Sequence, residues 1–153
     1  MTTPEERIAE LGLTLPEVVP PLAAYIPAVR TGNLVYTSGQ VPMVEGKLVG
    51  SGRVGADLTA EEAAGHARIC ALNAIAALKS QVGDLAQIVR IVKVVVFVAS
   101  APDFTGQPGV GNGASDLLRD VFGDAGVHAR SAVGVAALPL GASVEVELIA
   151  EVS

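Results

Sequence analysis

Two charged residues near the end of the chain are of the types that bind and hydrolyse a small acid. Arg130 stands two positions after His128, and Glu145 comes shortly after the turn sequence Leu-Pro-Leu-Gly. A guanidinium can hold a carboxylate through two parallel charge-assisted hydrogen bonds. A glutamate at the edge of a cleft can orient or deprotonate a water molecule. This pair would therefore suit hydrolysis of a small carboxylic acid.

A closing β-hairpin is predicted to position these two side chains. If its turn spans Pro139 to Ala142, antiparallel pairing places Glu145 opposite about Ala136. Arg130 is then about six residues further along its strand, or about 20 Å away at about 3.3 Å per residue. No small substrate bridges that distance. Either the two residues serve different purposes, or they meet across a subunit boundary in a homo-oligomer.

Local signals predict most of the remaining elements. Two capping boxes, beginning at Thr3 and Thr59, mark the starts of a short and a long helix, and Gly12 and Gly83 mark their ends. Gly-Asn and Glu-Gly pairs between apolar runs mark two hairpin turns. The expected elements are a helix from Pro4 to about Leu11, hairpins over 28–38 and 43–49, a helix over 60–82, a strand over 88–99 and a helix around 117–122.

Three segments are interpreted from their composition. The strand over 88–99 is almost continuously apolar, which is typical of a strand buried on both faces. The stretch from Thr105 to Gly113 is rich in glycine and is expected to be a loop. Pro16, Pro20, Pro21 and Pro27 predict an extended arm after the first helix.

The order of these elements predicts an α+β fold in a single domain. Two hairpins, a helix, a strand, a helix and a closing hairpin fit one mixed sheet with two helices packed on one face. We expect that domain to cover residues 1–153, with residues 1–24 forming the N-terminal helix and the Pro-rich arm. At 153 residues, the chain can bury a core of its own.

Composition argues against several classes of function. The formal net charge is −6 and aromatic residues make up 3%, so we expect no nucleic-acid partner and no anionic membrane surface. The single cysteine, Cys70, excludes an internal disulfide and fits a reducing compartment. The acidic start does not have the pattern of a signal peptide, and no apolar run approaches the roughly 18 residues of a spanning helix. We expect a cytoplasmic protein.

Several motifs, in order along the chain, resemble those of the Rid family of reactive intermediate deaminases, the YjgF type that is often labelled endoribonuclease L-PSP. The motifs are Gly32-Asn-Leu-Val-Tyr-Thr-Ser-Gly-Gln-Val-Pro42, an Ala-rich helix with Asn73, a Val-rich strand ending near Asp103-Phe104, Ala129-Arg-Ser131, and Leu138-Pro139 through Val144-Glu-Val146. Together they extend from about Tyr25 to Val152. The combination is specific, although each motif alone is weak.

The resemblance implies a chorismate-mutase-like fold, a homotrimer and sites in the clefts between subunits. It implies hydrolysis of 2-imino acids, or their enamine tautomers, to 2-oxo acids and ammonia, with no cofactor and no metal. Arg130 would hold the substrate carboxylate and Glu145 would position the attacking water. Ser38, the Gly39 amide and Tyr25 would line the cleft. An alternative is that the same cleft binds a small carboxylate without turnover, as a sensor or partner-binding trimer.

The chain departs from the usual family pattern near the proposed site. His128 replaces the usual proline or alanine, and Ala132 replaces a cysteine that many members carry. An N-terminal arm precedes the matched region, and the Gly-rich stretch from Phe104 to Gly113 is longer than in the deaminase archetype. These differences indicate a divergent branch of the family, with room for a different substrate.

The other chemically capable residues have simpler interpretations. His128 could act as an acid or base beside the cleft, or could be a loop histidine entering a strand. His66 is expected to be a solvated helix residue and Cys70 a core residue. The two histidines and the cysteine do not form a metal-binding pattern. Ser38 lacks the context of a nucleophile elbow, and the glycines over 109–113 are too far from the preceding strand for a dinucleotide loop.

Overall fold

The computed structural model describes residues 2–18 and 24–153. Pro20 and Pro21 of the expected arm lie outside these residues. The helices and strands are α1 (Pro4–Glu10), β1 (Ala28–Thr31), β2 (Leu34–Thr37), β3 (Met43–Val44), β4 (Lys47–Leu48), α2 (Ala60–Val82), β5 (Ile88–Ala99), α3 (Gln107–Phe122), β6 (Ala129–Val135) and β7 (Val144–Val152). Short 3₁₀ turns are η1 (Leu85–Gln87), η2 (Gly123–Gly126) and η3 (Pro139–Gly141). Both capping boxes and both N-terminal hairpins are confirmed.

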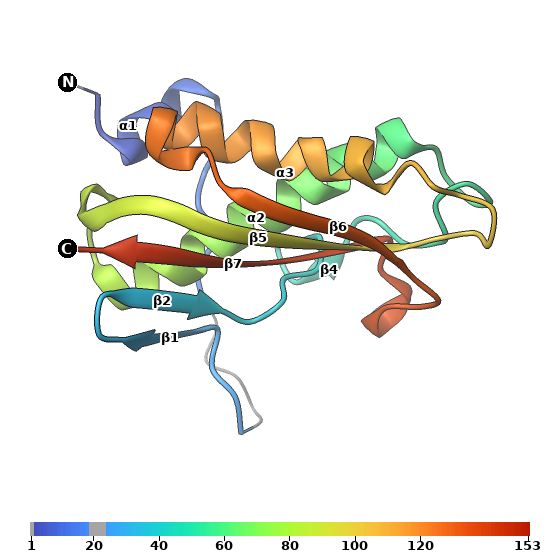
Figure 1. Ribbon diagram of the computed structural model, residues 1–153, viewed down its shortest axis with the longest axis horizontal. Helices are drawn as coiled ribbons and strands as arrows, with labels where there is room; N and C mark the ends of the chain where they lie inside the picture. Colours follow the sequence, from blue (N-terminus) through green and yellow to red (C-terminus); the bar gives the residue numbers. More distant parts are fainter. Residues whose placement is uncertain (1, 19–23) are drawn as a thin grey trace.

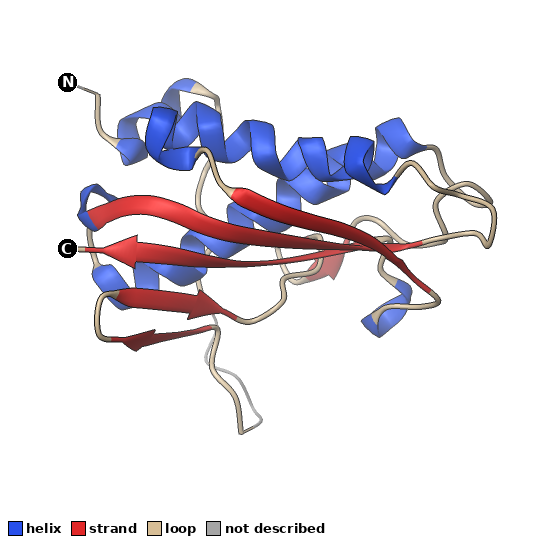
Figure 2. Ribbon diagram, viewed as in Figure 1, coloured by secondary structure: helices blue, strands red, loops and turns tan. Residues whose placement is uncertain are grey.

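The main sheet has five strands in the order β1-β2-β7-β5-β6, and β3 and β4 form a separate ribbon. Helices α2 and α3 pack against each other and cover one face of this sheet (Figures 1 and 2). The sheet is mixed, because β6 runs parallel to β5 while the other neighbours are antiparallel. The predicted α+β class, with one mixed sheet and two helices on one face, is therefore confirmed, and α1 adds a third helix.

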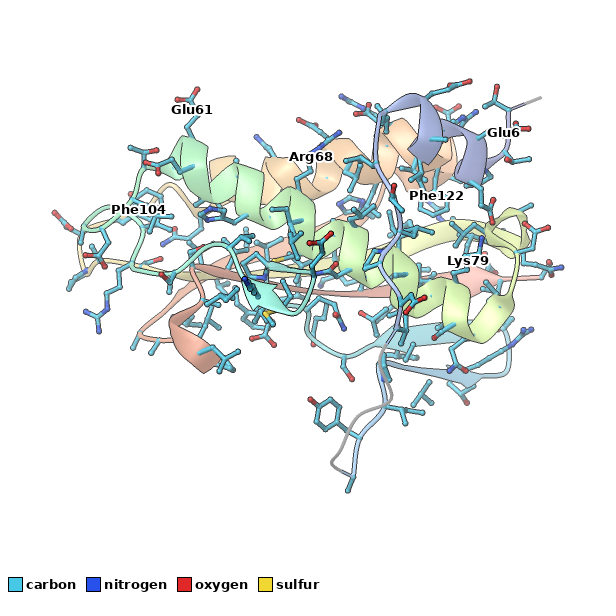
Figure 3. The ribbon with its side chains drawn as sticks, turned by 180° about the vertical axis from the view of Figure 1, so that it is seen from behind. Glu6, Glu61, Arg68, Lys79, Phe104 and Phe122 are labelled. Atoms are coloured by element: carbon cyan, nitrogen blue, oxygen red, sulfur yellow. The ribbon has the colours of Figure 1, made fainter. Side chains whose placement is uncertain are left out.

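The N-terminal helix is fixed to the rest of the chain by polar contacts. Glu5 accepts a hydrogen bond from the backbone amide of Leu85 at 2.8 Å and lies 3.3 Å from the ammonium of Lys79. Arg7 donates to the carbonyl of Val121 at 3.2 Å. Figure 3 shows Lys79 near the end of α2, beside the helix that carries Glu6. These contacts attach α1 to α2, η1 and α3.

The predicted closing hairpin is wrong. β6 pairs in parallel with β5, and β7 pairs antiparallel with β5 on its other side, so the two strands do not touch. Residues 136–143 cross from one side of β5 to the other. The alternation of apolar and polar residues in β7 fits any neighbouring strand equally well, which is why it did not reveal the true partner.

Strand β5 is buried on only one face of the described chain. Val94, Val96 and Val98 are completely buried beneath the helices, whereas Val95 and Phe97 on the opposite face are partly exposed. The expectation of burial on both faces is therefore wrong for the single chain. The uncovered face also carries exposed apolar side chains, among them Val29, Tyr36 and Val133. Apolar residues on this face of the sheet are therefore not buried by the chain's own helices.

The glycines expected in a loop lie mostly inside α3. This helix starts at Gln107 with a proline in its first turn, so Gly109, Gly111 and Gly113 are helical. A Cβ atom on Gly113 would overlap the backbone carbonyl of Ala64 in α2, and one on Gly111 would lie 3.2 Å from Arg130 Nη1. The glycines therefore allow α3 to approach α2 closely and leave space for the arginine. The predicted loop is wrong because these contacts offset the low helix propensity of glycine.

This contact predicts opposite effects for two alanine substitutions in the same helix. Gly113→Ala should lower the free energy of unfolding by about 1 to 3 kcal/mol, because the methyl group forces α2 and α3 apart. Gly109→Ala has open space around its new Cβ and should raise that free energy by up to about 1 kcal/mol through helix propensity. Urea unfolding of both variants measures the difference. Equal effects would show that the helices are not in close contact at Gly113.

The core between α2 and the sheet is built largely from small side chains. Buried alanines, with Ile75 and Leu78, form the inner side of α2. Cys70 is completely buried there and its thiol donates to the carbonyl of Val144 at 3.6 Å, so its predicted core position is confirmed. Burial raises the pKa of this thiol, which keeps it protonated and unreactive. The buried Asn73 amide donates to the carbonyls of Val41 and Met43, at 3.1 Å each, and fixes the segment after β2.

Candidate functional site

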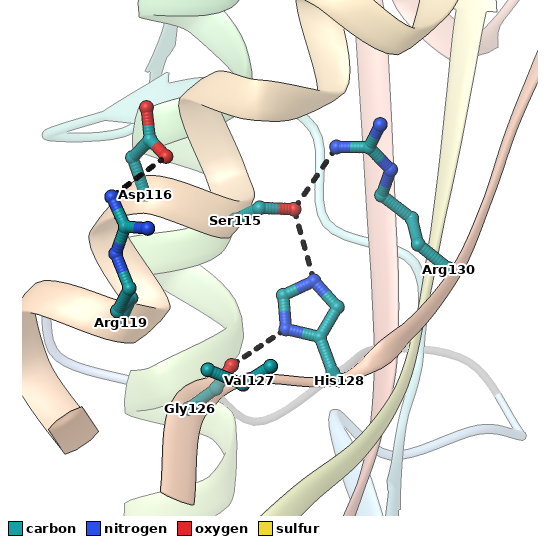
Figure 4. A pocket seen from close by; sticks show the side chains of 7 residues that line it. All are labelled: Ser115, Asp116, Arg119, Gly126, Val127, His128 and Arg130. Carbon is teal, nitrogen blue, oxygen red and sulfur yellow. Dashed lines mark hydrogen bonds and ion pairs between the residues drawn. The ribbon is translucent and has the colours of Figure 1, made fainter. Parts of the chain in front are cut away.

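Arg130 lies on the edge strand β6, with its side chain on the face covered by α3. Its Nη1 donates to Asn112 Oδ1 at 2.9 Å and to Ser115 Oγ at 3.1 Å (Figure 4 shows the contact with Ser115). Gly111 in the same helix leaves the space that the guanidinium occupies. Within the part of the chain that the structure describes, Nε and Nη2 form no hydrogen bond or ion pair. One edge of the guanidinium is thus fixed, and the other can receive a carboxylate.

His128 is connected to Arg130 through Ser115. Its Nδ1 lies 2.7 Å from the carbonyl oxygen of Gly126, and its Nε2 lies 2.9 Å from Ser115 Oγ (Figure 4). A carbonyl only accepts, so Nδ1 carries the proton and donates to Gly126, while Nε2 accepts from the Ser115 hydroxyl. Burial lowers the pKa of His128, the Gly126 hydrogen bond opposes that effect, and the Arg130 charge reinforces it. The imidazole is therefore neutral near neutral pH.

A surface cavity of about 200 Å³ opens beside these residues. It is lined by Ser115, Asp116, Arg119, Gly126, Val127, His128 and Arg130 (Figure 4). The Arg119 guanidinium lies 3.6 Å from the carboxylate of Asp116, and both side chains are well exposed. Such an exposed pair contributes little binding energy of its own. Of the two arginines that line the cavity, Arg130 is therefore the one that hydrogen bonds hold in place.

Glu145 and Gly39 lie together at a different place. A Cβ atom on Gly39 would overlap the Glu145 carboxylate, so only glycine leaves that side chain its present position. Burial raises the pKa of Glu145, and the nearby charge of Glu147 raises it further. A carboxylate with a raised pKa is a stronger base than an ordinary glutamate.

Ser38 connects this second group to the segment that carries Tyr25. The Ser38 hydroxyl donates to the carbonyl of Ile26 at 2.6 Å. Tyr25 immediately precedes Ile26 in the chain, and its side chain is 63% exposed. Of the residues predicted for the site, the structure brings Ser38, Gly39 and Glu145 close together, with Tyr25 nearby, and it leaves Arg130 elsewhere.

Arg130 and Glu145 do not converge within one chain. Arg130 pairs with Val94 of β5, whereas Glu145 pairs with Phe97 from the opposite side of that strand. They are therefore separated by about 10 Å along β5 and about 10 Å across the strands. Arg130 reaches α3, while Glu145 alternates with core valines and points away from the helices. Arg130 and Glu145 lie apart because β5 separates their strands and because their side chains are on opposite faces of the sheet. The predicted hairpin register is not the cause.

Sequence reasoning missed two polar residues that contact Arg130. Asn112 and Ser115 were assigned to a loop and to its border with a helix, and neither belongs to a recognisable motif. Their spacing of three residues places them on one face of a helix, so a correct start of α3 at Gln107 would have paired them.

The remaining candidates have structural roles or none. His66 was expected to be solvated, but it is partly buried, and its Nδ1 lies 2.9 Å from the hydroxyl of the buried Ser143. No group of three or more potential metal-ligating side chains is found among residues 2–18 and 24–153. Within those residues no helix has the length and apolar character needed to cross a bilayer.

Comparison with known families identifies the chain. Residues 5–152 match the family described as "YjgF/chorismate_mutase-like, putative endoribonuclease". The chain therefore belongs to the YjgF/Rid family, and its sheet and helices form the chorismate-mutase-like fold of that family.

Known relatives cover almost the whole chain. Protein TCP17 of Trypanosoma cruzi is 44% identical over 148 residues, which are 96% of this chain and 92% of that protein. A 2-iminobutanoate/2-iminopropanoate deaminase of Dermatophagoides farinae is 33% identical over 138 residues, or 90% of this chain and 92% of the deaminase.

Two solved structures show how the fold is shared. The protein Atu1372 of Agrobacterium tumefaciens, of unknown function, superposes with a TM-score of 0.93 at 46% identity, covering 99% of this chain and 94% of that one. E. coli TdcF, solved with bound serine, superposes with a TM-score of 0.63 at 25% identity, covering 90% and 94%.

Proposed function

We propose that this protein is a cytoplasmic, cofactor-free deaminase that hydrolyses small 2-imino acids, or their enamine tautomers, to 2-oxo acids and ammonia. The observation that carries the proposal is the Arg130 guanidinium, which is held by α3 through Nη1, lines the cavity, and forms no hydrogen bond at Nε or Nη2 within the described residues. The relation to a 2-iminobutanoate/2-iminopropanoate deaminase at 33% identity supports the same activity. In this proposal residues 1–153 form one Rid-type domain.

The proposed site is shared between the subunits of a homotrimer. Arg130 of one subunit and Glu145 of the next face a common cleft, to which Tyr25, Ser38 and the Gly39 amide contribute. The separation of Arg130 and Glu145 within the chain supports this arrangement. So do the exposed apolar side chains on the uncovered face of the sheet, because a second subunit would remove them from water.

The reaction needs orientation and one proton acceptor. Arg130 holds the substrate carboxylate, and the protonated imine carbon is already electrophilic. Glu145 takes a proton from water as the oxygen attacks that carbon, which forms a carbinolamine. Glu145 then passes that proton to nitrogen, and the C–N bond breaks as the hydroxyl group loses its proton to solvent, which releases ammonia and leaves the 2-oxo acid. The raised pKa of Glu145 suits it to both proton transfers.

A non-catalytic binding protein is the second candidate. In that case the Arg130 cavity holds a small carboxylate, and the protein acts as a sensor or as a partner-binding trimer. The observation that favours it is the structure of TdcF with bound serine, an amino acid that carries the same carboxylate group. The departures at His128 and Ala132 also leave room for a ligand that is bound without turnover. RNA cleavage stays disfavoured by the net charge of −6.

Ammonia release separates the two candidates. A pyridoxal-phosphate enzyme generates 2-imino acids in situ, and ammonia formation is followed with wild type and with Arg130→Ala. Wild type should accelerate release, and the variant should not. If wild type does not exceed the variant, the deaminase proposal fails, and calorimetric titration with 2-oxobutanoate then tests the binding candidate. Absence of Arg130-dependent binding would exclude that candidate as well.

A further inference from the structure

We propose that Ser115 and His128 form a positioning relay that fixes the Arg130 guanidinium for carboxylate binding and makes that binding sensitive to acid. The inference rests on the proposed function of Arg130 and adds two positioning residues to it. Neither residue touches the substrate in this proposal. Both act through the conformation of Arg130.

The relay is a directed chain of hydrogen bonds. The Gly126 carbonyl accepts from His128 Nδ1 at 2.7 Å and thereby selects the tautomer whose Nε2 carries a lone pair. That lone pair accepts the Ser115 hydroxyl proton at 2.9 Å. The hydroxyl is thus oriented with its oxygen lone pairs available to Arg130 Nη1, which donates to it at 3.1 Å. Each bond fixes the direction of the next.

Asn112 completes the support of the guanidinium. Its Oδ1 accepts from the same Nη1 at 2.9 Å, so the two acceptors from one helix face define the plane of the group. A guanidinium so held presents Nε and Nη2 as a preformed pair of donors. Binding then requires little further ordering of the side chain, which increases affinity without any added contact to the ligand.

Protonation of His128 would disrupt this arrangement. A proton on Nε2 turns the acceptor of the Ser115 hydroxyl into a donor and places a second positive charge next to Arg130. Asp116 and Arg119 of α3 line the same cavity, and Asp124 of η2 accepts a hydrogen bond from the Val127 amide through its backbone carbonyl. Arg90 of β5 donates to the Val127 carbonyl at 3.5 Å and adds further positive charge. The dominant charged neighbour is Arg130 itself.

The direction of the pH effect follows from this geometry. The relay is intact while His128 is neutral, and the pKa of His128 lies below the ordinary value of about 6.5. Carboxylate affinity should therefore be constant at neutral pH and should fall as the pH decreases through that lowered pKa. A glutamine at position 128 can offer an oxygen to Ser115 and does not titrate.

Calorimetric titration with 2-oxobutanoate tests the relay. The titrations are done in a Glu145→Gln background, which removes the other group with a shifted pKa near the proposed cleft. His128→Ala and Ser115→Ala should each weaken binding about tenfold at neutral pH, the size expected for one lost hydrogen bond. His128→Gln should retain most of the affinity and lose the decrease at acid pH. His66→Gln, which removes the other histidine, should keep that decrease.

Nitrogen NMR of the unliganded protein provides a second readout. It should show the His128 proton on Nδ1, and the Arg130 Nε–H signal should broaden or average in Ser115→Ala. The relay is wrong if the proton is on Nε2, or if His128→Ala binds as tightly as wild type with the same pH profile. If wild type binds no 2-oxo acid at all, the proposed function fails, and the NMR result still decides whether the relay exists.

Discussion

Replacement of Arg130 by lysine should weaken binding of a 2-oxo acid by roughly 100-fold while leaving the fold intact. Lysine keeps the positive charge, but its compact ammonium cannot contact Asn112, Ser115 and both carboxylate oxygens together. Loss of the paired hydrogen bonds to a charged ligand removes about 1.5 to 3 kcal/mol, and loss of the fixed orientation adds to that. The effect should be the same between about pH 7 and about pH 9, where a lysine with an ordinary pKa of about 10.4 stays charged.

Calorimetry and thermal unfolding of the same samples separate binding from stability. Arg53→Lys is a suitable control, because Arg53 is exposed and its side chain forms no hydrogen bond within the described chain. This control should bind as wild type does. Near-normal affinity of Arg130→Lys would contradict two parallel hydrogen bonds to the carboxylate. It would show that Arg130 attracts the ligand through its charge alone.

Replacement of Glu145 by glutamine should lower the turnover rate by about 10²- to 10⁴-fold, the usual contribution of a positioned general base. Glutamine retains the size and shape that Gly39 accommodates, so the affinity for a 2-oxo acid should change little. The rate of ammonia release at saturating substrate measures the effect. An unchanged rate would exclude Glu145 as the group that activates water.

The pH profile of turnover checks the same role. The active form of Glu145 is the carboxylate, and burial, followed by the charge of Glu147, raises its pKa above the usual range. Turnover should therefore fall as the pH decreases through that raised pKa. Glu147→Gln removes the neighbouring charge and should move this decrease to lower pH without abolishing turnover. If turnover of Glu147→Gln falls at the same pH as that of wild type, the decrease at acid pH belongs to another group.

Sequence alone predicted the elements that are determined by local chemistry. The capping boxes at Thr3 and Thr59 and the turn at Gly32-Asn33 fix backbone geometry within a few residues, and all three were predicted correctly. The position of β5 between β6 and β7 depends on contacts between distant residues, and no local pattern encodes it. The glycines inside α3 also depend on contacts between distant residues, because Gly113 lies against the backbone of Ala64 in another helix.

The candidate site shows a similar division. Arg130 and Glu145 are singled out by their chemistry, and Ser38, Gly39 and Tyr25 by the family resemblance. The structure brings Ser38, Gly39 and Glu145 close together, with Tyr25 nearby, and leaves Arg130 elsewhere. Arg130 and Glu145 are on opposite faces of the sheet because β6 and β7 each pair with β5. The predicted hairpin could not reveal this arrangement. The Ser115 contact was missed because a lone serine within a helix carries no local signal of its role.

The central claim is that Arg130 and Glu145 from neighbouring subunits form one site, and mixed oligomers test it directly. Arg130→Ala and Glu145→Gln are each expected to be inactive. If the two are unfolded and refolded together in equal amounts, some interfaces receive an intact Arg130 from one chain and an intact Glu145 from the other. Random mixing should restore about a quarter of the wild-type rate of ammonia release. A mixture no more active than the separate variants would contradict a site shared between subunits.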